Sequence, residues 1–171
     1  MSLTVIIPVR NEEDLILKTL SEFQNSWIIN IDHEILIIND NSSDRTAELI
    51  TNSSFTKLKT KLIDNKKIGL GSAITCGIDN SSKELVSIFM ADMSDNLDDL
   101  KLYYEKMESD KTLDSVFGSR FIRNSKIKNY PTFKFILNRL ANNIIKLIFF
   151  SKYNDFTNAF KIYKKNAILK T

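Results

Sequence analysis

Two acidic turns hold the side chains of this chain that are best suited to chemistry. Asp40 follows the apolar run at residues 35–38, and Asp92 follows the apolar run at residues 85–91. In an open α/β sheet, ligands bind beyond the carboxyl ends of the strands. Carboxylates delivered there from two strands suit a nucleotide base or ribose and a divalent metal on a diphosphate. The two turns therefore predict a nucleotide-diphosphate site.

Each acid also has a structural alternative. A polar turn that caps the next helix explains Ser43 and Asp44, but it explains Asp40 less well, and Asp40 can accept hydrogen bonds from a base or a ribose. Asp92 follows a run that we expect to be buried, where an unpaired carboxylate is costly and a hard cation bridging two phosphates would stabilise it. The alternative is that Asp95 caps the next helix, which leaves Asp92 unexplained. We therefore expect Asp40 and Asp92 to be functional.

The turn after the first apolar run contains Pro8, Arg10, Asn11 and Glu12. One interpretation is structural: Asn11 caps the first helix, and Glu12 complements the positive end of the helix dipole. In the other interpretation, these four residues and Ser42 of the second turn line a nucleotide pocket. The residues alone leave both interpretations open.

Further candidates for phosphate binding lie later in the chain. Gly71 belongs to the glycine loop at residues 69–73, which either faces a phosphate at a helix start or makes a turn with tight helix packing. This loop lacks the Gly-Lys-Ser/Thr ending of a P-loop. Arg120 follows a short strand, where a guanidinium suits bidentate contact with a phosphate. Lys134 follows within a short distance and extends this predicted anion site.

Charge is divided unevenly along the chain. Residues 1–117 contain 12 Lys and Arg and 20 Asp and Glu, whereas residues 118–171 contain 12 Lys and Arg and a single acid, Asp155. Such a split favours a negatively charged partner for the second part, with a basic solvated surface as the alternative. Nucleic acid is the least favoured partner, because this part contains no motif of an RNA- or DNA-binding module. Asp155 either pairs with a lysine or lies at a reaction centre.

Short apolar runs alternate with helix-like patterns along most of the chain. The predicted strands are Thr4–Val9, Glu34–Asn39, Lys59–Ile63, Leu85–Ala91, Ser115–Phe117 and Ala159–Tyr163. The predicted helices are Glu12–Asn25, Asp44–Thr51, Gly71–Asn80, Asp98–Ser109 and Phe133–Phe150. Continuous apolar strands are typical of a parallel sheet that is buried on both faces. The pattern predicts an α/β fold with a mostly parallel, Rossmann-like sheet flanked by helices.

The helix predicted at residues 133–150 is apolar on most sides and carries Lys134, Arg139 and Lys146. It is either a core helix or a basic amphipathic helix in a membrane interface. No uncharged apolar run reaches the roughly 20 residues of a membrane span, and the N-terminus lacks the features of a signal peptide. We therefore expect a cytoplasmic protein that associates peripherally with the cytoplasmic face of a membrane.

Taken in order, these motifs resemble the family 2 glycosyltransferases of the GT-A fold, and among them the branch of the dolichyl-phosphate mannose synthases and their bacterial relatives. The matching segments are residues 5–13, 38–46, 69–73, 91–96, 118–121 and 154–163, which span almost the whole chain. Each segment is weak alone, and their order and spacing carry the resemblance. One departure concerns the family's Asp-x-Asp metal motif, in which Met90 replaces the first acid and Asp92 matches the second.

The resemblance implies a GT-A domain that binds a UDP- or GDP-sugar with Mg²⁺ or Mn²⁺ and often uses a polyprenyl-phosphate acceptor. It implies that Asp40 contacts the nucleotide base. It also implies that Asp92 holds the metal beside Ala91, and that Arg120 approaches phosphate. Together with Asp155, Asp92 and Arg120 are the predicted catalytic residues.

We expect one catalytic domain over residues 1–171, either complete or cut short at its C-terminal end. Its predicted activity is transfer of a sugar from a nucleoside-diphosphate sugar to a lipid-linked phosphate. One alternative is transfer to a saccharide hydroxyl in cell-surface polysaccharide synthesis, which needs a general base such as Asp155. Another alternative is a nucleotide-sugar-binding domain without turnover.

Overall fold

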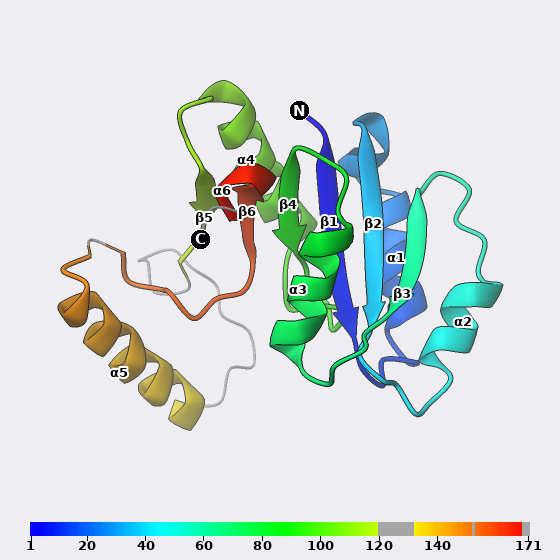
Figure 1. The fold of residues 1–171 in the computed structure, drawn as a ribbon, viewed down its shortest axis with the longest axis horizontal. Helices are drawn as coiled ribbons and strands as arrows, with labels where there is room; N and C mark the ends of the chain where they lie inside the picture. Colours follow the sequence, from blue (N-terminus) through cyan, green and yellow to red (C-terminus); the bar gives the residue numbers. More distant parts are fainter. Residues whose placement is uncertain (120–131, 152, 169–171) are drawn as a thin grey trace. The chain divides into compact units, whose positions relative to one another are not determined.

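The computed structural model describes residues 1–119, 132–151 and 153–168 (Figure 1). The chain divides into two compact units, the first made of Met1–Val116 with Phe160–Thr171 and the second of Phe117–Ala159. Arg120 lies outside the described residues, and so does the side chain of Lys134. The roles expected of these two residues therefore stay predictions.

The strands form one six-stranded sheet in the order β3-β2-β1-β4-β6-β5. They are β1 (Leu3–Val9), β2 (His33–Asn39), β3 (Thr60–Asp64), β4 (Leu85–Ile88), β5 (Ser115–Phe117) and β6 (Lys161–Lys164). Strand β1 pairs in parallel with β2 and β4, β2 pairs in parallel with β3, and β6 pairs antiparallel to β4. The predicted mostly parallel sheet is confirmed.

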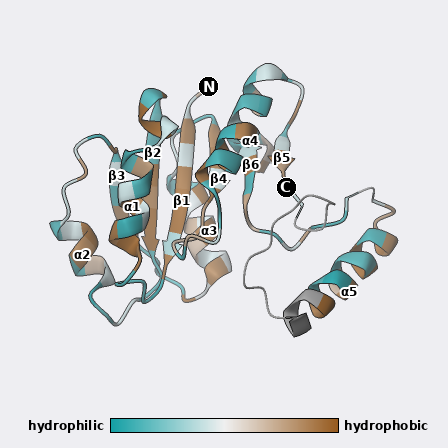
Figure 2. Ribbon diagram, turned by 180° about the vertical axis from the view of Figure 1, so that it is seen from behind, coloured by the Kyte–Doolittle hydropathy of each residue, from teal (hydrophilic) through white to brown (hydrophobic). Residues whose placement is uncertain are grey.

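Helices cover both faces of this sheet, with α3 in front of it in Figure 1 and α1 in front of it in Figure 2. The helical elements are α1 (Ile16–Gln24), η1 (Trp27–Asn30), α2 (Thr46–Asn52), α3 (Leu70–Asn80), α4 (Leu97–Ser109), α5 (Thr132–Ile148) and α6 (Lys165–Ile168). Successive residues of β1 point to opposite faces of the sheet. Val5 and Ile7 belong to the hydrophobic cluster that includes α1 and α4, whereas Ile6 belongs to the cluster that includes α3. This is why the strands read as continuous apolar runs.

Helix α3 approaches the sheet closely at Gly77. A Cβ atom built on Gly77 would lie 2.4 Å from Cγ2 of Ile6 in β1. Only a residue without a side chain lets the helix backbone lie this near the strand. The tight helix packing considered for the glycine loop thus occurs later in α3, because a Cβ at Gly69 or Gly71 meets no atom within 4 Å.

The second unit contains α5 and the segment that follows it. Asn142 of α5 is fully buried, and its Nδ2 donates a hydrogen bond of 3.0 Å to Oγ1 of Thr157. The backbone N–H of Phe156 donates to Oδ1 of the same asparagine. The helix therefore holds the following segment through a buried amide. Within the described ranges, we find no helix that combines the length and the apolar character needed to cross a bilayer.

Candidate functional site at the carboxyl edge of the sheet

Three neighbouring strands are followed by turns that each contain a residue with a positive φ angle. Asn11, Asn41 and Met93 have positive φ angles of 57°, 58° and 58°. The register offsets β1 from β2 by 30 residues (3 to 33) and from β4 by 82 residues (3 to 85), so these residues occupy equivalent positions. Asparagine tolerates the left-handed conformation, but it is uncommon for methionine. A left-handed residue thus recurs after three adjacent strands.

The residue before each left-handed position is charged: Arg10 after β1, Asp40 after β2 and Asp92 after β4. When the same offsets are continued past the last paired residues, these three residues also correspond to one another. The strand order places β1, and hence Arg10, between the strands that carry the two acids. Asp40 and Asp92 therefore lie at one edge of one sheet, as the sequence predicts.

Strands β1 and β4 stop pairing before this edge. Pairing of β1 with β2 continues to the end of β1, whereas pairing with β4 stops at Ile6 and Ile88. The Ile6 carbonyl accepts a last hydrogen bond of 2.9 Å from the Phe89 N–H, and Pro8, two residues further on, has no N–H to continue the ladder. This explains why β4 is shorter than the strand predicted over residues 85–91.

The gap in pairing coincides with the point where the winding of the sheet reverses. From β1 the chain moves outward through β2 to β3, and then returns to the other side of β1 to form β4. In open α/β sheets, ligands bind outside the carboxyl ends of the strands at such a switch point. The carboxyl edge at β1 and β4 is therefore the candidate functional site.

Hydrogen bonds join the first turn to the second. The Asn11 N–H donates to Oγ of Ser42 at 3.2 Å, and Oδ1 of Asn11 accepts from the Ser43 N–H at 2.8 Å. The Glu12 N–H donates to Oγ1 of Thr46 at 2.8 Å. The interpretation of Asn11 as a cap of the first helix is wrong, because its side chain binds the second turn. These contacts hold the two turns in one arrangement at the edge.

Asp40 is nearly buried, with 5% of its surface exposed. Its Oδ1 accepts a hydrogen bond of 2.8 Å from Nδ2 of Asn65, and both of its oxygens lie 3.0 Å from the Gly69 nitrogen. Nδ2 of Asn65 also donates to Oγ of Ser72 in α3 at 2.8 Å. We call Asp40, Asn65, Gly69 and Ser72 the Asp40 network. It fastens the loop before α3 to the end of β2.

Gly69 is the position in this network that requires glycine. Its φ of 125° lies in a region that other residues rarely adopt. Gly71, predicted to bind phosphate, lies in the first turn of α3 with open space around it. The glycine loop is thus held by a buried carboxylate, and Gly71 stays a prediction as a phosphate-binding residue.

Asp92 is exposed, so the expectation that it needs a cation because it is buried is wrong. Its Oδ1 accepts a hydrogen bond of 3.0 Å from the Ser94 N–H within the turn. Asp95 does not cap α4, since the cap is Asn96, whose Oδ1 accepts from the Asp98 N–H at 2.7 Å. Asp95 accepts instead from the N–H of Met90 at 2.8 Å. These hydrogen bonds within the turn fix its conformation, and they leave the side chain of Asp92 exposed to solvent.

The end of β4 is also tied to α1. Ala91 is buried, and its carbonyl accepts a hydrogen bond of 2.8 Å from Oγ1 of Thr19. The side chain of Thr19 is itself almost completely buried. This contact fixes the backbone immediately before Asp92, so the direction of the third turn is set by the first helix.

Negative charge accumulates where the three turns meet. Burial, and then the charges of Asp92 and Asp44, raise the pKa of Glu12 above its ordinary value. Asp44 accepts hydrogen bonds from the N–H and Oγ1 of Thr46, and although desolvation opposes them, these bonds lower its pKa. Glu12 after β1 and Asp92 after β4 are therefore close enough to repel each other. A cation or a hydrogen-bond donor at this point would relieve the repulsion.

The oxygen donors at this edge suit a hard divalent ion only if a bound ligand supplies further oxygens. Among the residues that the structure describes, no three His, Cys, Asp or Glu side chains gather around a metal position. Asp92 offers one carboxylate, and its negative charge acts on the carboxyl group of Glu12. Mg²⁺ is often held by one or two carboxylates with substrate phosphates completing the shell. The site fits such an ion when a diphosphate supplies the remaining oxygens.

Asp155, predicted to be catalytic, lies in the second unit and is 1% exposed. It stands next to Phe156, whose backbone is bound by the buried Asn142. Asp155 is therefore part of an ordered, buried segment, and its role in a reaction stays a prediction.

Asn65 and Thr46 hold the turns of the candidate site, and neither is predicted from the sequence. Asn65 is 6% exposed and follows β3, the strand next to β2. Asn65 could have been predicted, because a polar residue at the end of a third parallel strand reaches the same edge of the sheet as Asp40. Thr46 had no such signal, since its hydroxyl acts on the backbone of a distant turn.

Comparison with known sequences places this chain in a family. The profile described as "Glycosyl transferase family 2" matches residues 4–170. A dolichol-phosphate mannosyltransferase of Pyrococcus furiosus is 28% identical over 142 residues, which is 82% of this chain and 39% of that protein. A dolichyl-phosphate beta-glucosyltransferase of Trichomonas vaginalis is 31% identical over 127 residues, 68% of this chain and 38% of that protein.

The fold resembles that of solved GT-A glycosyltransferases. The mannosyltransferase PcManGT from Pyrobaculum calidifontis, crystallised in complex with GDP-Man and Mn²⁺, superposes with a TM-score of 0.67 at 18% identity. The match covers 98% of this chain and 46% of that one. This chain spans about two fifths of the length of the two curated relatives. The α/β fold predicted as GT-A is confirmed, and the chain belongs to glycosyl transferase family 2.

Proposed function

We propose that this chain transfers a glycosyl group from a nucleoside-diphosphate sugar to a lipid-linked phosphate. The observation that carries the proposal is the alignment of Arg10, Asp40 and Asp92 at the switch point of the sheet. A donor diphosphate needs cations and a nucleoside needs hydrogen-bond acceptors, and both kinds of group lie at this edge. The names of the two curated relatives support a lipid-linked phosphate as acceptor.

In this proposal, the Asp40 network forms the nucleoside end of the site. The carboxylate of Asp40 would accept from a base N–H, and Asn65 and Gly69 hold it in place for that contact. The donor is a UDP- or GDP-sugar, and the complex of PcManGT with GDP-Man shows that a protein of this fold can hold such a donor. Pro8, Asn11 and the other residues of the two joined turns would line the same pocket.

The diphosphate would lie between the first and third turns. Arg10 is exposed there, and its guanidinium suits bidentate contact with phosphate oxygens. Asp92, assisted by Glu12, would hold Mg²⁺ or Mn²⁺ against the diphosphate. When bound, such an ion stabilises the negative charge that develops on the departing diphosphate. Arg120 and Lys134 would add positive charge for phosphate binding.

The reaction would be a direct displacement at the anomeric carbon. A bond forms from that carbon to an acceptor phosphate oxygen, while the bond to the diphosphate breaks and its electron pair leaves with the nucleoside diphosphate. A phosphate acceptor is already an anion near neutral pH, so the step needs little help from a general base. The residues of the edge would act by holding donor and acceptor in line.

The test incubates the full chain with Mn²⁺, a radiolabelled UDP- or GDP-sugar and a short polyprenyl phosphate, followed by extraction into butanol. We expect label in butanol, and none when the matched polyprenol without phosphate replaces the acceptor. Transfer of the label to a water-soluble saccharide would contradict the lipid acceptor and favour the saccharide alternative. Donor binding without transfer to either acceptor would favour a binding domain without turnover.

A further inference from the structure

We propose that Asp40 selects a donor whose base carries a single imide N–H, uracil or thymine, and disfavours guanine. This inference rests on the proposed function, because it names the nucleoside of the donor that the same site would bind. Its physical basis is the number and the direction of the hydrogen-bond acceptors that the Asp40 network leaves free.

The carboxylate of Asp40 already accepts hydrogen bonds from two groups of the protein. Its Oδ1 accepts from Nδ2 of Asn65 at 2.8 Å, and the Gly69 nitrogen lies 3.0 Å from Oδ1 and 3.0 Å from Oδ2. An ionised carboxylate has about four lone-pair positions. The bond from Asn65 takes one of them, and the shared bond from Gly69 takes one on each oxygen. Oδ2 therefore keeps one position for a ligand.

The Gly69 N–H occupies the place that a guanine base would need. Because the Gly69 nitrogen is equally far from both oxygens of Asp40, it lies between them, where a pair of parallel donors binds a carboxylate. Guanine presents such a pair, its ring N1–H and its exocyclic amino group. At Asp40 only one of these donors can be bonded, and the other loses water without gaining an acceptor. Guanine is therefore disfavoured.

Uracil and thymine need only the acceptor that Asp40 has left. Each presents one N–H, at N3, between two carbonyl groups, so a single acceptor satisfies it. Cytosine has an unprotonated nitrogen at N3, and the lone pair of that nitrogen would face the carboxylate oxygen. Asp40 is only 5% exposed, so a base can approach it from a narrow range of directions. The free acceptor thus matches an imide N–H.

The loop that blocks the guanine position is held before any ligand binds. The Asn65 N–H donates to the Asn39 carbonyl of β2 at 2.9 Å, which fixes the start of the loop. Oγ of Ser72 donates to the Gly69 carbonyl at 2.8 Å, which fixes its end. Room for a bidentate base would require these bonds to break. A preorganised acceptor therefore keeps its preference when a nucleotide binds.

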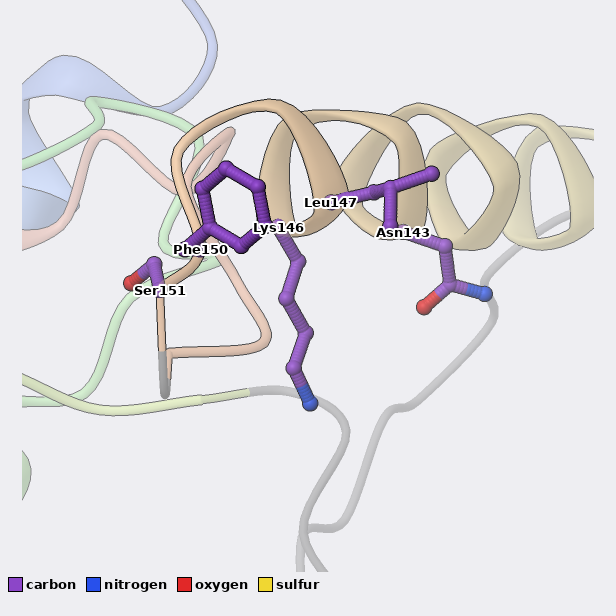
Figure 3. A pocket seen from close by; sticks show the side chains of 5 residues that line it. All are labelled: Asn143, Lys146, Leu147, Phe150 and Ser151. Carbon is purple, nitrogen blue, oxygen red and sulfur yellow. The ribbon is translucent and has the colours of Figure 1, made fainter.

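The groove of the second unit offers no comparable acceptor. It is lined by Asn143, Lys146, Leu147, Phe150 and Ser151 (Figure 3). In Figure 3, the side chains of Lys146 and Asn143 extend to one side of the helix. None of the five lining residues carries a carboxylate, so this groove has no charged acceptor for a base N–H. We therefore assign base selection to Asp40.

The test is isothermal titration calorimetry of the full chain with Mn²⁺ and UDP, dTDP, GDP, IDP or CDP. IDP is the matched control for GDP, because hypoxanthine differs from guanine only in lacking the amino group. We expect UDP or dTDP to bind roughly tenfold more tightly than GDP and CDP, and IDP to bind several-fold more tightly than GDP. The tighter of UDP and dTDP identifies the base, since only thymine carries the methyl group.

Asp40→Asn tests the same preference from the side of the protein. The amide NH₂ can donate to N3 of cytosine but cannot accept from N3–H of uracil. We expect the ratio of the affinities for UDP and CDP to fall roughly tenfold or more. General damage to the fold would weaken both nucleotides alike and leave this ratio unchanged. The control Asp79→Asn, at an exposed acid of α3, should also leave it unchanged.

Three results would overturn the inference and leave the proposed function standing: GDP binding as tightly as UDP and dTDP, equal affinities for GDP and IDP, or an unchanged ratio in Asp40→Asn. Binding of none of the five nucleotides would contradict the inference and the proposed function together, because the chain would then hold no donor.

Discussion

Replacing Asp40 by alanine tests whether the Asp40 network holds the site together. Among the described residues, the change removes the hydrogen-bond partner of the Gly69 N–H and one of the two acceptors of Asn65 Nδ2. Hydrogen bonds to a charged group each contribute roughly 1.5–3 kcal/mol. Removal of a nearly buried charge offsets part of this loss, because its desolvation no longer has to be compensated.

We therefore expect Asp40→Ala to lower the free energy of unfolding by about 2–4 kcal/mol. For a chain of this length, the midpoint of thermal unfolding should fall by roughly 5–12 °C. The assay is urea unfolding of the full chain followed by circular dichroism. Asp79→Ala is the matched control, since Asp79 is an exposed acid of α3, and it should change the free energy by less than about 0.5 kcal/mol.

A double-mutant cycle separates the network from general damage. If Asp40 and Asn65 act together, the effects of Asp40→Ala and Asn65→Ala should fall short of additivity by roughly 1 kcal/mol. Equal stability of Asp40→Ala and the Asp79→Ala control, or strict additivity with Asn65→Ala, would refute the reasoning.

Three further predictions concern packing and charge. Gly77→Ala should destabilise the protein by about 1–3 kcal/mol in urea unfolding, because its Cβ would collide with Ile6. Gly71→Ala should instead stabilise it by roughly 0.5–1 kcal/mol, since open space surrounds that helical position; equal effects of the two changes would contradict the packing described. Because the Glu12 pKa is raised above 4.5, folding binds a proton, so stability contributed by protonated Glu12 is lost as pH rises from about 4.5 through the raised pKa. In a carbon-13 NMR titration, Asp92→Asn should move the Glu12 pKa downward, and an unchanged pKa would show that the two carboxylates do not interact.

Much of the fold and part of the site follow from local sequence patterns. Continuous apolar runs predict buried parallel strands, and the rule that ligands lie beyond strand ends places Asp40 and Asp92 at one edge before any coordinates are known. The strand boundaries agree within a few residues except at β4. There, Pro8 of a neighbouring strand removes a donor, which is a tertiary effect that the sequence of β4 alone does not contain.

The rest depends on contacts between distant segments. Asparagine is a residue type that commonly caps helices, yet the side chain of Asn11 binds a turn 32 residues away. Asp95 likewise accepts a hydrogen bond from the Met90 N–H of its own turn, and it does not cap the helix that follows. Each of these residue types can cap a helix or bind a turn, and the contacts between neighbouring strand ends determine which of the two forms.

The central claim is that the aligned residues Asp40 and Asp92 bind a nucleotide-sugar donor. Isothermal titration calorimetry of UDP- and GDP-sugars with Mn²⁺ tests it most directly, with the full chain, Asp40→Asn, Asp92→Asn and the control Asp79→Asn. We expect saturable binding of one donor class, weakened roughly tenfold or more, or about 1.4 kcal/mol, by each of the first two changes and unaffected by the third. Absence of binding by the unchanged protein, or equal affinity in all four proteins, would contradict the account.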